Sequence, residues 1–201
     1  AEGAMRGLFS ILFGAGVVLF LGRDNSGRGW LHVKRTFWLL IFGLINGYLL
    51  LWTGDILVTY ALCGFILFFV RNVSGQRLFI SSCVIFALLT LQNAAMHLGL
   101  EYLEGSAEKV ETLKTQGKPI PEDLKAADAD WREFADEYLP STQKISEEVS
   151  ARGESYASAF NWTLEHNTEI LLGSIWFIML PDALAAMLLG MALFKLSLIH
   201  I

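Results

Sequence analysis

Cysteine is scarce in this sequence, and so are the short motifs that commonly mark soluble enzymes. The two cysteines, Cys63 and Cys83, lie singly within apolar runs, and no CxxC pair or Cys/His spacing typical of zinc sites is present. A glycine-rich phosphate loop, a GxSxG element and an HExxH motif are also absent. The sequence therefore predicts no metal site, and no resident cofactor is evident from it.

Charged residues are scarce as well, and they are unevenly distributed. They make up 17% of the chain, whereas soluble domains typically hold roughly 25%. Residues 101–169 contain 16 of the 20 acids against seven lysines and arginines, a net charge of −9, while the rest of the chain carries +4. The net charge of −5 comes from this one segment and does not indicate a nucleic-acid partner. The rest of the chain has few charged residues for its length, which indicates that it lies in a lipid bilayer.

Long apolar runs are abundant. A helix needs about 20 mainly apolar residues to cross the roughly 30 Å hydrocarbon core, and helices satisfy their own backbone hydrogen bonds in lipid. The runs do not alternate as barrel strands would. The sequence predicts an all-α fold, a polytopic transmembrane helix bundle, with four spans in residues 1–100 and a fifth near the end. Their predicted bounds are about 5–21, 36–52, 56–70, 78–98 and 169–195.

The acidic stretch before the last span, residues 101–168, predicts a water-exposed helical insert. Pro121 followed by Glu122 and Asp123 indicates a helix start, because proline and acids are favoured in a first turn. Apolar residues then recur at three- and four-residue spacing, as in an amphipathic helix: Leu124, Ala127, Trp131, Phe134, Ala135 and Tyr138. Two interpretations stay open, a helical cap on the bundle and a separate binding domain.

Lysine and arginine in the short loops give the orientation, because basic loops stay on the cytoplasmic side. Loops 23–35 and 71–77 are basic and Lys195 lies at the end of the fifth span, whereas the turn at residues 52–55 has no basic residue. Alternation then places the basic loops in the cytoplasm, and both the 52–55 turn and the insert outside. The insert is predicted to be extracytoplasmic.

Both ends of the chain suggest a longer protein. The sequence opens at Ala1 without an initiator methionine, almost directly in an apolar run, so we expect a preceding segment. Residues 196–201, Leu-Ser-Leu-Ile-His-Ile, match the translation of a common sequencing adapter. We expect this segment to be a sequencing artefact outside the natural protein.

Ionisable groups at membrane depth are costly, and each is a candidate for function. Asp55 is the first, because it follows Gly54 in a turn too short to leave the bundle. Its carboxylate could act as a general base, or it could cap the helix that starts at Ile56, since aspartate is a preferred N-cap. Gly54 permits a tight turn.

Further polar residues lie within the predicted spans. Asn46 could donate a hydrogen bond to another helix. Gln92, Asn93 and His97 lie towards the outer end of the fourth span, with Asn93 and His97 on one helix face. His97 could carry protons, or it could simply bind water or backbone.

Arg6 and Asp182 complete the charged candidates. Arg6 lies at the predicted outer end of the first span, where it could pair with Asp55, hold an anionic headgroup or extend to the interface. Asp182 follows Pro181, which suggests that the fifth span is broken near Pro181; the break could line a cavity or be a kink.

Small residues predict where helices approach closely. Gly43 and Gly47 are four residues apart in the second span, Gly14 and Gly16 flank Ala15 in the first, and Gly190 lies in the fifth. These glycines are interpreted as packing positions.

Three stretches resemble a known family. The first is Met5-Arg6-Gly7-Leu8-Phe9-Ser10-Ile11-Leu12-Phe13-Gly14-Ala15-Gly16. The second consists of four short blocks, which are Lys34-Arg35, Gly43-Leu44-Ile45-Asn46, Gly54-Asp55-Ile56-Leu57 and Tyr60-Ala61-Leu62. The third is Leu188-Leu189-Gly190-Met191-Ala192-Leu193. They are similar to segments of the YeiB-like bacterial membrane proteins, whose domain of unknown function is number four-one-eight. The resemblance implies a bacterial cytoplasmic (inner) membrane protein with more helices than this chain contains.

The family is distantly similar to transmembrane acyltransferases, which implies acyl-coenzyme A as a possible donor. The family often has histidine where this chain has Asn46, and an amide cannot accept a proton near neutral pH. His97 is the nearest substitute for that histidine.

Three functions follow as hypotheses. The first is acyl transfer to a small-molecule or envelope acceptor outside the cytoplasm, with Asp55 and His97 as catalytic residues. Its candidate substrate-binding residues are Arg6, Asn46, Gly54, Tyr60, Gln92, Asn93 and Asp182. The second is a transporter or permease with a site at Asp55 and the broken fifth span. The third is a non-catalytic membrane scaffold. The sequence does not predict the oligomeric state.

Overall fold

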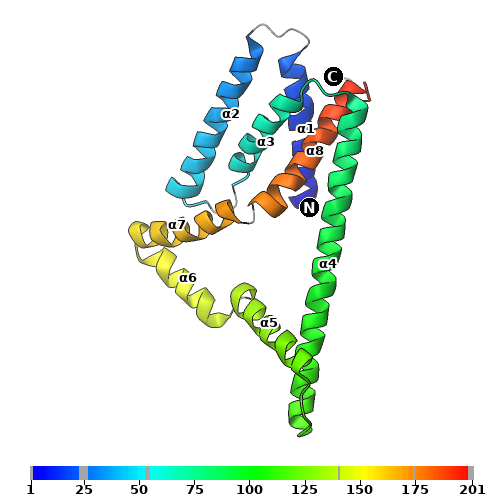
Figure 1. Cartoon of the computed structure of the whole chain (residues 1–201). Helices are drawn as coiled ribbons and strands as arrows, with labels where there is room; N and C mark the ends of the chain where they lie inside the picture. Colours follow the sequence, from blue (N-terminus) through cyan, green and yellow to red (C-terminus); the bar gives the residue numbers. More distant parts are fainter. Residues whose placement is uncertain (1, 23–26, 53–54, 140, 174, 199–201) are drawn as a thin grey trace. The chain divides into compact units, whose positions relative to one another are not determined.

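A computed structural model describes residues 2–22, 27–52, 55–139, 141–173 and 175–198 (Figure 1). Within these residues every regular element is helical, and the prediction of an all-α membrane helix bundle is confirmed. The α-helices are α1 (Glu2–Leu21), α2 (Arg28–Leu44), α3 (Leu57–Val70), α4 (Gly75–Thr115), α5 (Glu122–Tyr138), α6 (Thr142–Glu154), α7 (Tyr156–Leu172) and α8 (Leu180–Lys195). Two short π-helices are η1 (Ile45–Leu49) and η2 (Ile175–Met179). Residues 199–201, within the expected artefact, lie outside the described residues.

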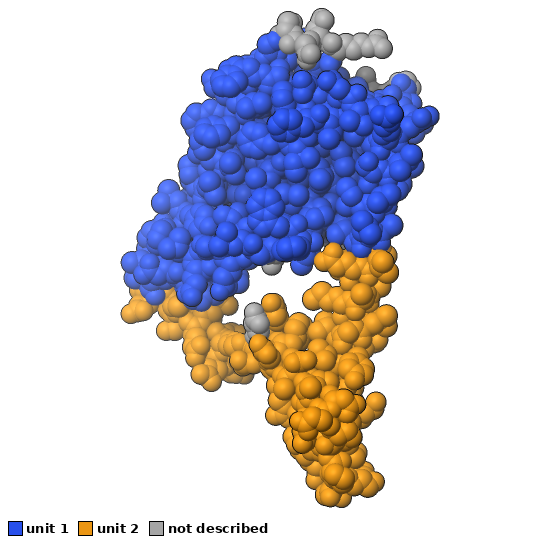
Figure 2. All heavy atoms as spheres, in the orientation of Figure 1, with its two compact units in different colours: residues 1–89, 155–201 blue, residues 90–154 orange. Residues whose placement is uncertain are grey.

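The chain forms two compact units (Figure 2). Unit 1 holds residues 1–89 and 155–201, and unit 2 holds residues 90–154. Helix α4 continues from one unit into the other without interruption. The predicted insert covers residues 101–168, whereas unit 2 covers residues 90–154. Helix α7 belongs to unit 1.

Unit 1 is built on a close contact between α1 and α8. A β-carbon on Gly14 would lie 1.9 Å from the carbonyl oxygen of Met187, and one on Gly190 would lie 1.9 Å from that of Ile11. Only glycine leaves room for two backbones at this separation. Buried side chains of α1, α3, α4 and α8 surround the contact, including Tyr60 and Met191.

Further contacts attach α2, α3 and α4 to this pair. Gly43 lies against the backbone of Val58, where an added β-carbon would be 2.8 Å from the Val58 nitrogen, so α2 and α3 also meet at a glycine. Ser82 of α4 donates a hydrogen bond to the carbonyl oxygen of Ala185 in α8 at 2.8 Å. A serine hydroxyl that bonds to a backbone carbonyl of another helix is a common interhelical contact in membranes.

The surface of unit 1 is suited to lipid. In the described part of the chain, three helical segments are long and apolar enough to cross a bilayer: Gly3–Leu21, Gly75–Thr115 and Ile175–Lys195. Large apolar side chains point outwards on several helices, and Phe69 is 79% exposed. Apolar faces of this extent are unfavourable in water and favourable against acyl chains or further helices. The chain is therefore part of an integral membrane protein.

Unit 2 consists of the end of α4 together with α5 and α6. Val110 of α4 and Ala127 of α5 are buried, and Lys114 lies 3.9 Å from the Asp128 carboxylate. Arg132, one turn beyond Asp128, donates to the same carboxylate at 3.1 Å. The aromatic rings of Trp131, Phe134 and Tyr138 stack along α5 at three- and four-residue spacing.

Candidate functional site

Polar side chains gather at one end of unit 1, near the first turns of α1, α3 and α8. They are Arg6, Ser10, Asp55, Tyr60 and Asp182, and ion pairs, hydrogen bonds or shared cavities join them. The spans around them are almost purely apolar. Such a cluster at membrane depth needs an explanation, because each polar group loses hydration there.

Asp55 uses its two carboxylate oxygens differently. Oδ1 accepts a hydrogen bond from the backbone N–H of Leu57 at 3.1 Å, so the side chain satisfies the first N–H of α3, although the N-cap residue of that helix is Ile56. Oδ2 is buried and has no hydrogen-bond partner among the described residues. A buried carboxylate oxygen without a donor is costly, and in native proteins it commonly marks a place for water, an ion or a substrate. Gly54, the neighbouring candidate, lies outside the described residues.

Two small cavities, of about 60 Å³ each, open beside Asp55 and share Met179. One is lined by Arg6, Thr59 and Tyr60. The other is lined mainly by η1, α7 and η2, with Tyr48, Trp52, Asn167, Ile170 and Ile175 among its residues. Both π-helices thus contribute to the cavity wall, and π-helical turns frequently occur at functional sites. Each cavity is large enough for a few waters or one small polar group.

Arg6 is held by α8. Its Nη2 donates to the Asp182 carboxylate at 3.0 Å, so the partner of Arg6 is Asp182 rather than the Asp55 considered from the sequence. The reason is the close α1–α8 contact at Gly14 and Gly190, which places the first turns of these helices side by side. Pro181 lies in the first turn of α8, where its missing N–H costs no helical hydrogen bond.

Tyr60 belongs to a short hydrogen-bond chain. The Ser10 and Tyr60 hydroxyls lie 2.6 Å apart, and each is placed to donate to the carbonyl oxygen of Arg6, Ser10 at 2.9 Å and Tyr60 at 3.3 Å. The ring of Tyr60 stacks on Phe9, with 5.7 Å between ring centroids. This chain fixes the first turns of α1 and α3 against each other beside Asp55.

The Arg6–Asp182 ion pair can be tested by a double-mutant cycle of Arg6→Gln and Asp182→Asn. Because both side chains are partly exposed, we expect a coupling of about 0.5–1 kcal/mol in the free energy of unfolding. Denaturation of the four proteins in detergent micelles measures it. Strictly additive single substitutions would show that the pair contributes nothing to stability.

The remaining predicted residues lie elsewhere. Asn46 is half-buried in η1, and its carbonyl oxygen accepts from the Trp52 N–H at 3.2 Å. Gln92, Asn93 and His97 are exposed on the α4 segment of unit 2, whereas Asp55 belongs to unit 1. His97 Nε2 lies 3.8 Å from the Glu101 carboxylate, one turn away on the same helix.

Sequence reasoning missed two polar residues of unit 1. Asn167 donates to the carbonyl oxygen of Gly47 at 2.6 Å and lines a cavity with Asp55, but it lies in the stretch read as a water-exposed insert. His32 is buried with its Nε2 3.0 Å from the Gly64 carbonyl oxygen, although it was placed in a basic loop. A prediction of helix for residues 28–35 would have placed His32 in the helix bundle.

In the described part of the chain, no group of three His, Cys, Asp or Glu residues is placed to hold a metal ion.

Comparison with known proteins finds partial similarities. YxaH of Bacillus subtilis (strain 168), an uncharacterized protein, is 40% identical over 87 residues, which are 42% of this chain and 21% of YxaH. YeiB of Escherichia coli (strain K12), also uncharacterized, is 48% identical over 59 residues, which are 29% of this chain and 14% of YeiB. These segments support a YeiB-like family, and they cover less than a quarter of either relative. No family model matches the chain, and no solved structure is significantly similar to it.

Proposed function

We propose that this chain is part of a membrane enzyme that transfers an acyl group from a thioester to an acceptor hydroxyl or amine, with Asp55 as general base. The observation that carries the proposal is the buried Oδ2 of Asp55, which lies beside two cavities without a hydrogen-bond donor. The other oxygen is fixed by the Leu57 N–H, so Oδ2 is held in place rather than free to rotate. A positioned carboxylate of this kind suits proton abstraction.

The reaction uses Asp55 to make the acceptor nucleophilic. Oδ2 takes the proton of the acceptor O–H or N–H as that atom attacks the carbonyl carbon of the thioester. The C–S bond then breaks, and the departing thiolate takes up the proton that Asp55 removed, so the carboxylate is regenerated. Arg6 lines the Asp55–Tyr60 cavity, and its guanidinium has further N–H donors beyond the one given to Asp182. Those donors could stabilise the negative oxygen of the tetrahedral intermediate.

An acyl donor that carries phosphates, such as acyl-coenzyme A, would need positively charged side chains to bind those phosphates. These side chains would lie at the end of unit 1 away from Asp55, where the acceptor binds. Arg71 and Lys195 supply them at the other end of α3 and α8, where they line a cavity of about 580 Å³ with Asn72 and Phe194. Arg71 lies 16 residues after Asp55, and a helix of that length spans roughly 24 Å. This distance suits a long donor that enters at the basic end and reacts near Asp55.

The two π-helices favour transport as a second candidate. Irregular backbone within a membrane is tolerated where it lines a cavity, and interrupted helices carry the substrate sites of many transporters. Both η1 and η2 contribute to the cavity that contains Asp55 and Asn167. A transporter would move its substrate without any cleavage of a thioester.

The test uses the complete gene product that contains this chain, reconstituted in liposomes with radiolabelled acetyl-coenzyme A on the side of the basic loops. Loss of thioester together with label in a lumenal mixture of sugars and amines supports acyl transfer. Uptake of an unmodified solute without thioester loss would favour transport instead. A folded protein that does neither would overturn both proposals and leave a scaffold role.

A further inference from the structure

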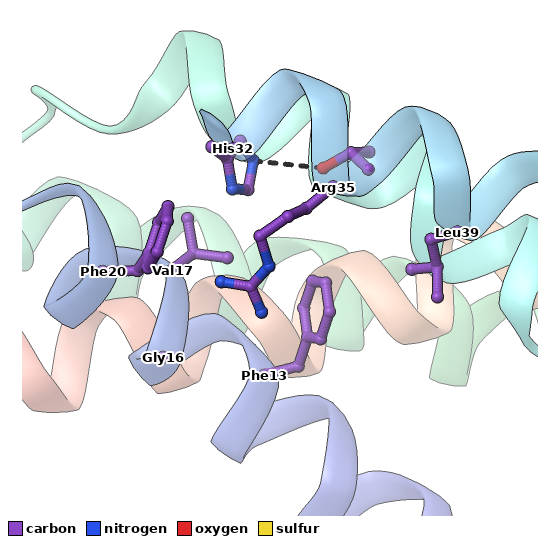
Figure 3. Close-up of a pocket in the computed structure, with 8 residues that line it drawn as sticks. Phe13, Gly16, Val17, Phe20, His32, Arg35 and Leu39 are labelled. Atoms are coloured by element: carbon purple, nitrogen blue, oxygen red, sulfur yellow. Dashed lines mark hydrogen bonds between the residues drawn. The ribbon is translucent and has the colours of Figure 1, made fainter. Parts of the chain in front are cut away.

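A further cavity, separate from those beside Asp55, lies between α1 and α2 (Figure 3). Its volume is about 260 Å³, and its walls are mainly the apolar side chains of Phe13, Val17, Phe20 and Leu39. Gly16 forms part of the wall, and a β-carbon added there would meet no atom within 4 Å. The space beside Gly16 is therefore open.

Among the described residues that line this cavity, Arg35 is the arginine. Figure 3 shows its side chain directed from α2 towards α1, with the guanidinium between Phe20 and Phe13. The guanidinium carbon lies 4.6 Å from the centre of the Phe20 ring. None of the ion pairs among the described residues involves Arg35, although five N–H donors are available on its guanidinium.

The neighbouring histidine is bonded to another helix. Because the Gly64 carbonyl oxygen can only accept, His32 Nε2 carries a proton and donates to it at 3.0 Å. His32 thus ties α2 to α3. Arg35 is the permanently charged residue in the described wall of the cavity.

Arg35 lies towards the end of unit 1 at which α1 ends and α2 begins. Phe20 is the second-last residue of α1, and Trp30, five residues before Arg35 on α2, is 71% exposed. Phe13 lies seven residues before Phe20, roughly 10 Å along the helix away from this end. The basic residues at 23–35 predict that this end faces the headgroups of a bilayer, which would place the charge of the cavity near the interface and its apolar wall deeper.

We propose that this cavity binds an anionic phospholipid, with the phosphate at Arg35 and part of one acyl chain against Phe13, Val17 and Leu39. The charge of Arg35 fits the phosphate, and the apolar wall fits the chain. The space left by Gly16 admits the chain between two helices. The proposal is independent of any chemistry at Asp55.

The test measures the binding of a fluorescent phosphatidylglycerol to the purified protein in mild detergent. We expect unlabelled phosphatidylglycerol to compete at least about fivefold more strongly than phosphatidylcholine or inorganic phosphate. Arg35→Gln should weaken binding about fivefold, while Arg35→Lys retains most of it because the charge remains. Lys34→Gln, an equal loss of charge on the neighbouring exposed residue, is the matched control and should leave binding within twofold.

A second variant tests the cavity itself. Gly16→Leu places a side chain in the space that the acyl chain would fill, and we expect it to weaken lipid binding while Gly16→Ala has little effect. Equal losses for Arg35→Gln and Lys34→Gln would overturn the proposal, because they would indicate nonspecific attraction to charge. Competition by inorganic phosphate as strong as that by phosphatidylglycerol would also overturn it, since the acyl chain would then contribute nothing.

Discussion

Replacing Gly14 by alanine is expected to lower the free energy of unfolding by about 3 kcal/mol, the upper part of the usual range for overpacked sites. The new β-carbon would lie 1.9 Å from the carbonyl oxygen of Met187, far inside van der Waals contact. Because the obstacle is the backbone of α8 and not a flexible side chain, α1 and α8 would have to move apart. Denaturation in detergent micelles, followed by circular dichroism, measures the change.

Gly190→Ala should have a similar effect, since its β-carbon would lie 1.9 Å from the carbonyl oxygen of Ile11. The matched control is Gly16→Ala, two residues from Gly14 on the same helix, where nothing lies within 4 Å of the new atom. Alanine is favoured over glycine in a helix interior by about 0.5–1 kcal/mol, so the control should be neutral or slightly stabilising. Equal effects of Gly14→Ala and Gly16→Ala would show that the α1–α8 contact is looser than described.

These glycines also show what the sequence could predict. Helical spans follow from apolar length alone, because a bilayer leaves no other partner for the backbone. Close packing at Gly14 and Gly190 follows from residue size. Neither prediction requires knowing which pairs of helices contact each other, and for that reason both could be made from one sequence.

The partners across helices could not be predicted in the same way. Arg6 pairs with Asp182, 176 positions away, and the choice between Asp182 and Asp55 depends on how α1 crosses α8. The start of α2 was also missed, because a search for apolar residues stops at Lys34 and Arg35. The helix begins at Arg28, and its long basic side chains can reach the interface from within a helical turn.

The sequence could name Arg6, Asp55 and Tyr60 as candidates, but it could not predict that they line one cavity. Asp55 stands out as a lone acid between two apolar runs, and this signal is local. Its neighbours in the other cavity, Asn167 and Met179, come from segments more than 100 positions later. Asn167 looked like part of a polar insert, since nothing in its immediate sequence distinguishes a residue packed on η1 from one in water.

The substitution Asp55→Asn is expected to reduce acyl transfer at least about 100-fold, the usual contribution of a general base. Asparagine keeps an oxygen that can accept from the Leu57 N–H, so the hydrogen bond at the start of α3 survives, but an amide cannot take the acceptor's proton. The measurement is the initial rate of label transfer in liposomes at saturating thioester, with the amount of folded protein matched between samples. Transfer at the wild-type rate would remove Asp55 from the chemistry.

Asp55→Ala separates the catalytic role from the hydrogen-bonding role. It removes both oxygens, so we expect the same loss of activity together with a loss of about 1 kcal/mol in the free energy of unfolding, the usual net contribution of one hydrogen bond, here the one from the Leu57 N–H. Asp55→Asn should leave that free energy unchanged or raise it, because it removes a buried charged oxygen that has no donor among the described residues. A residue whose replacement preserves stability and abolishes activity is retained for function at a cost to the fold. If Asp55→Asn instead destabilises the protein as much as Asp55→Ala does, the carboxylate is structural, and the unpartnered Oδ2 is not a catalytic base.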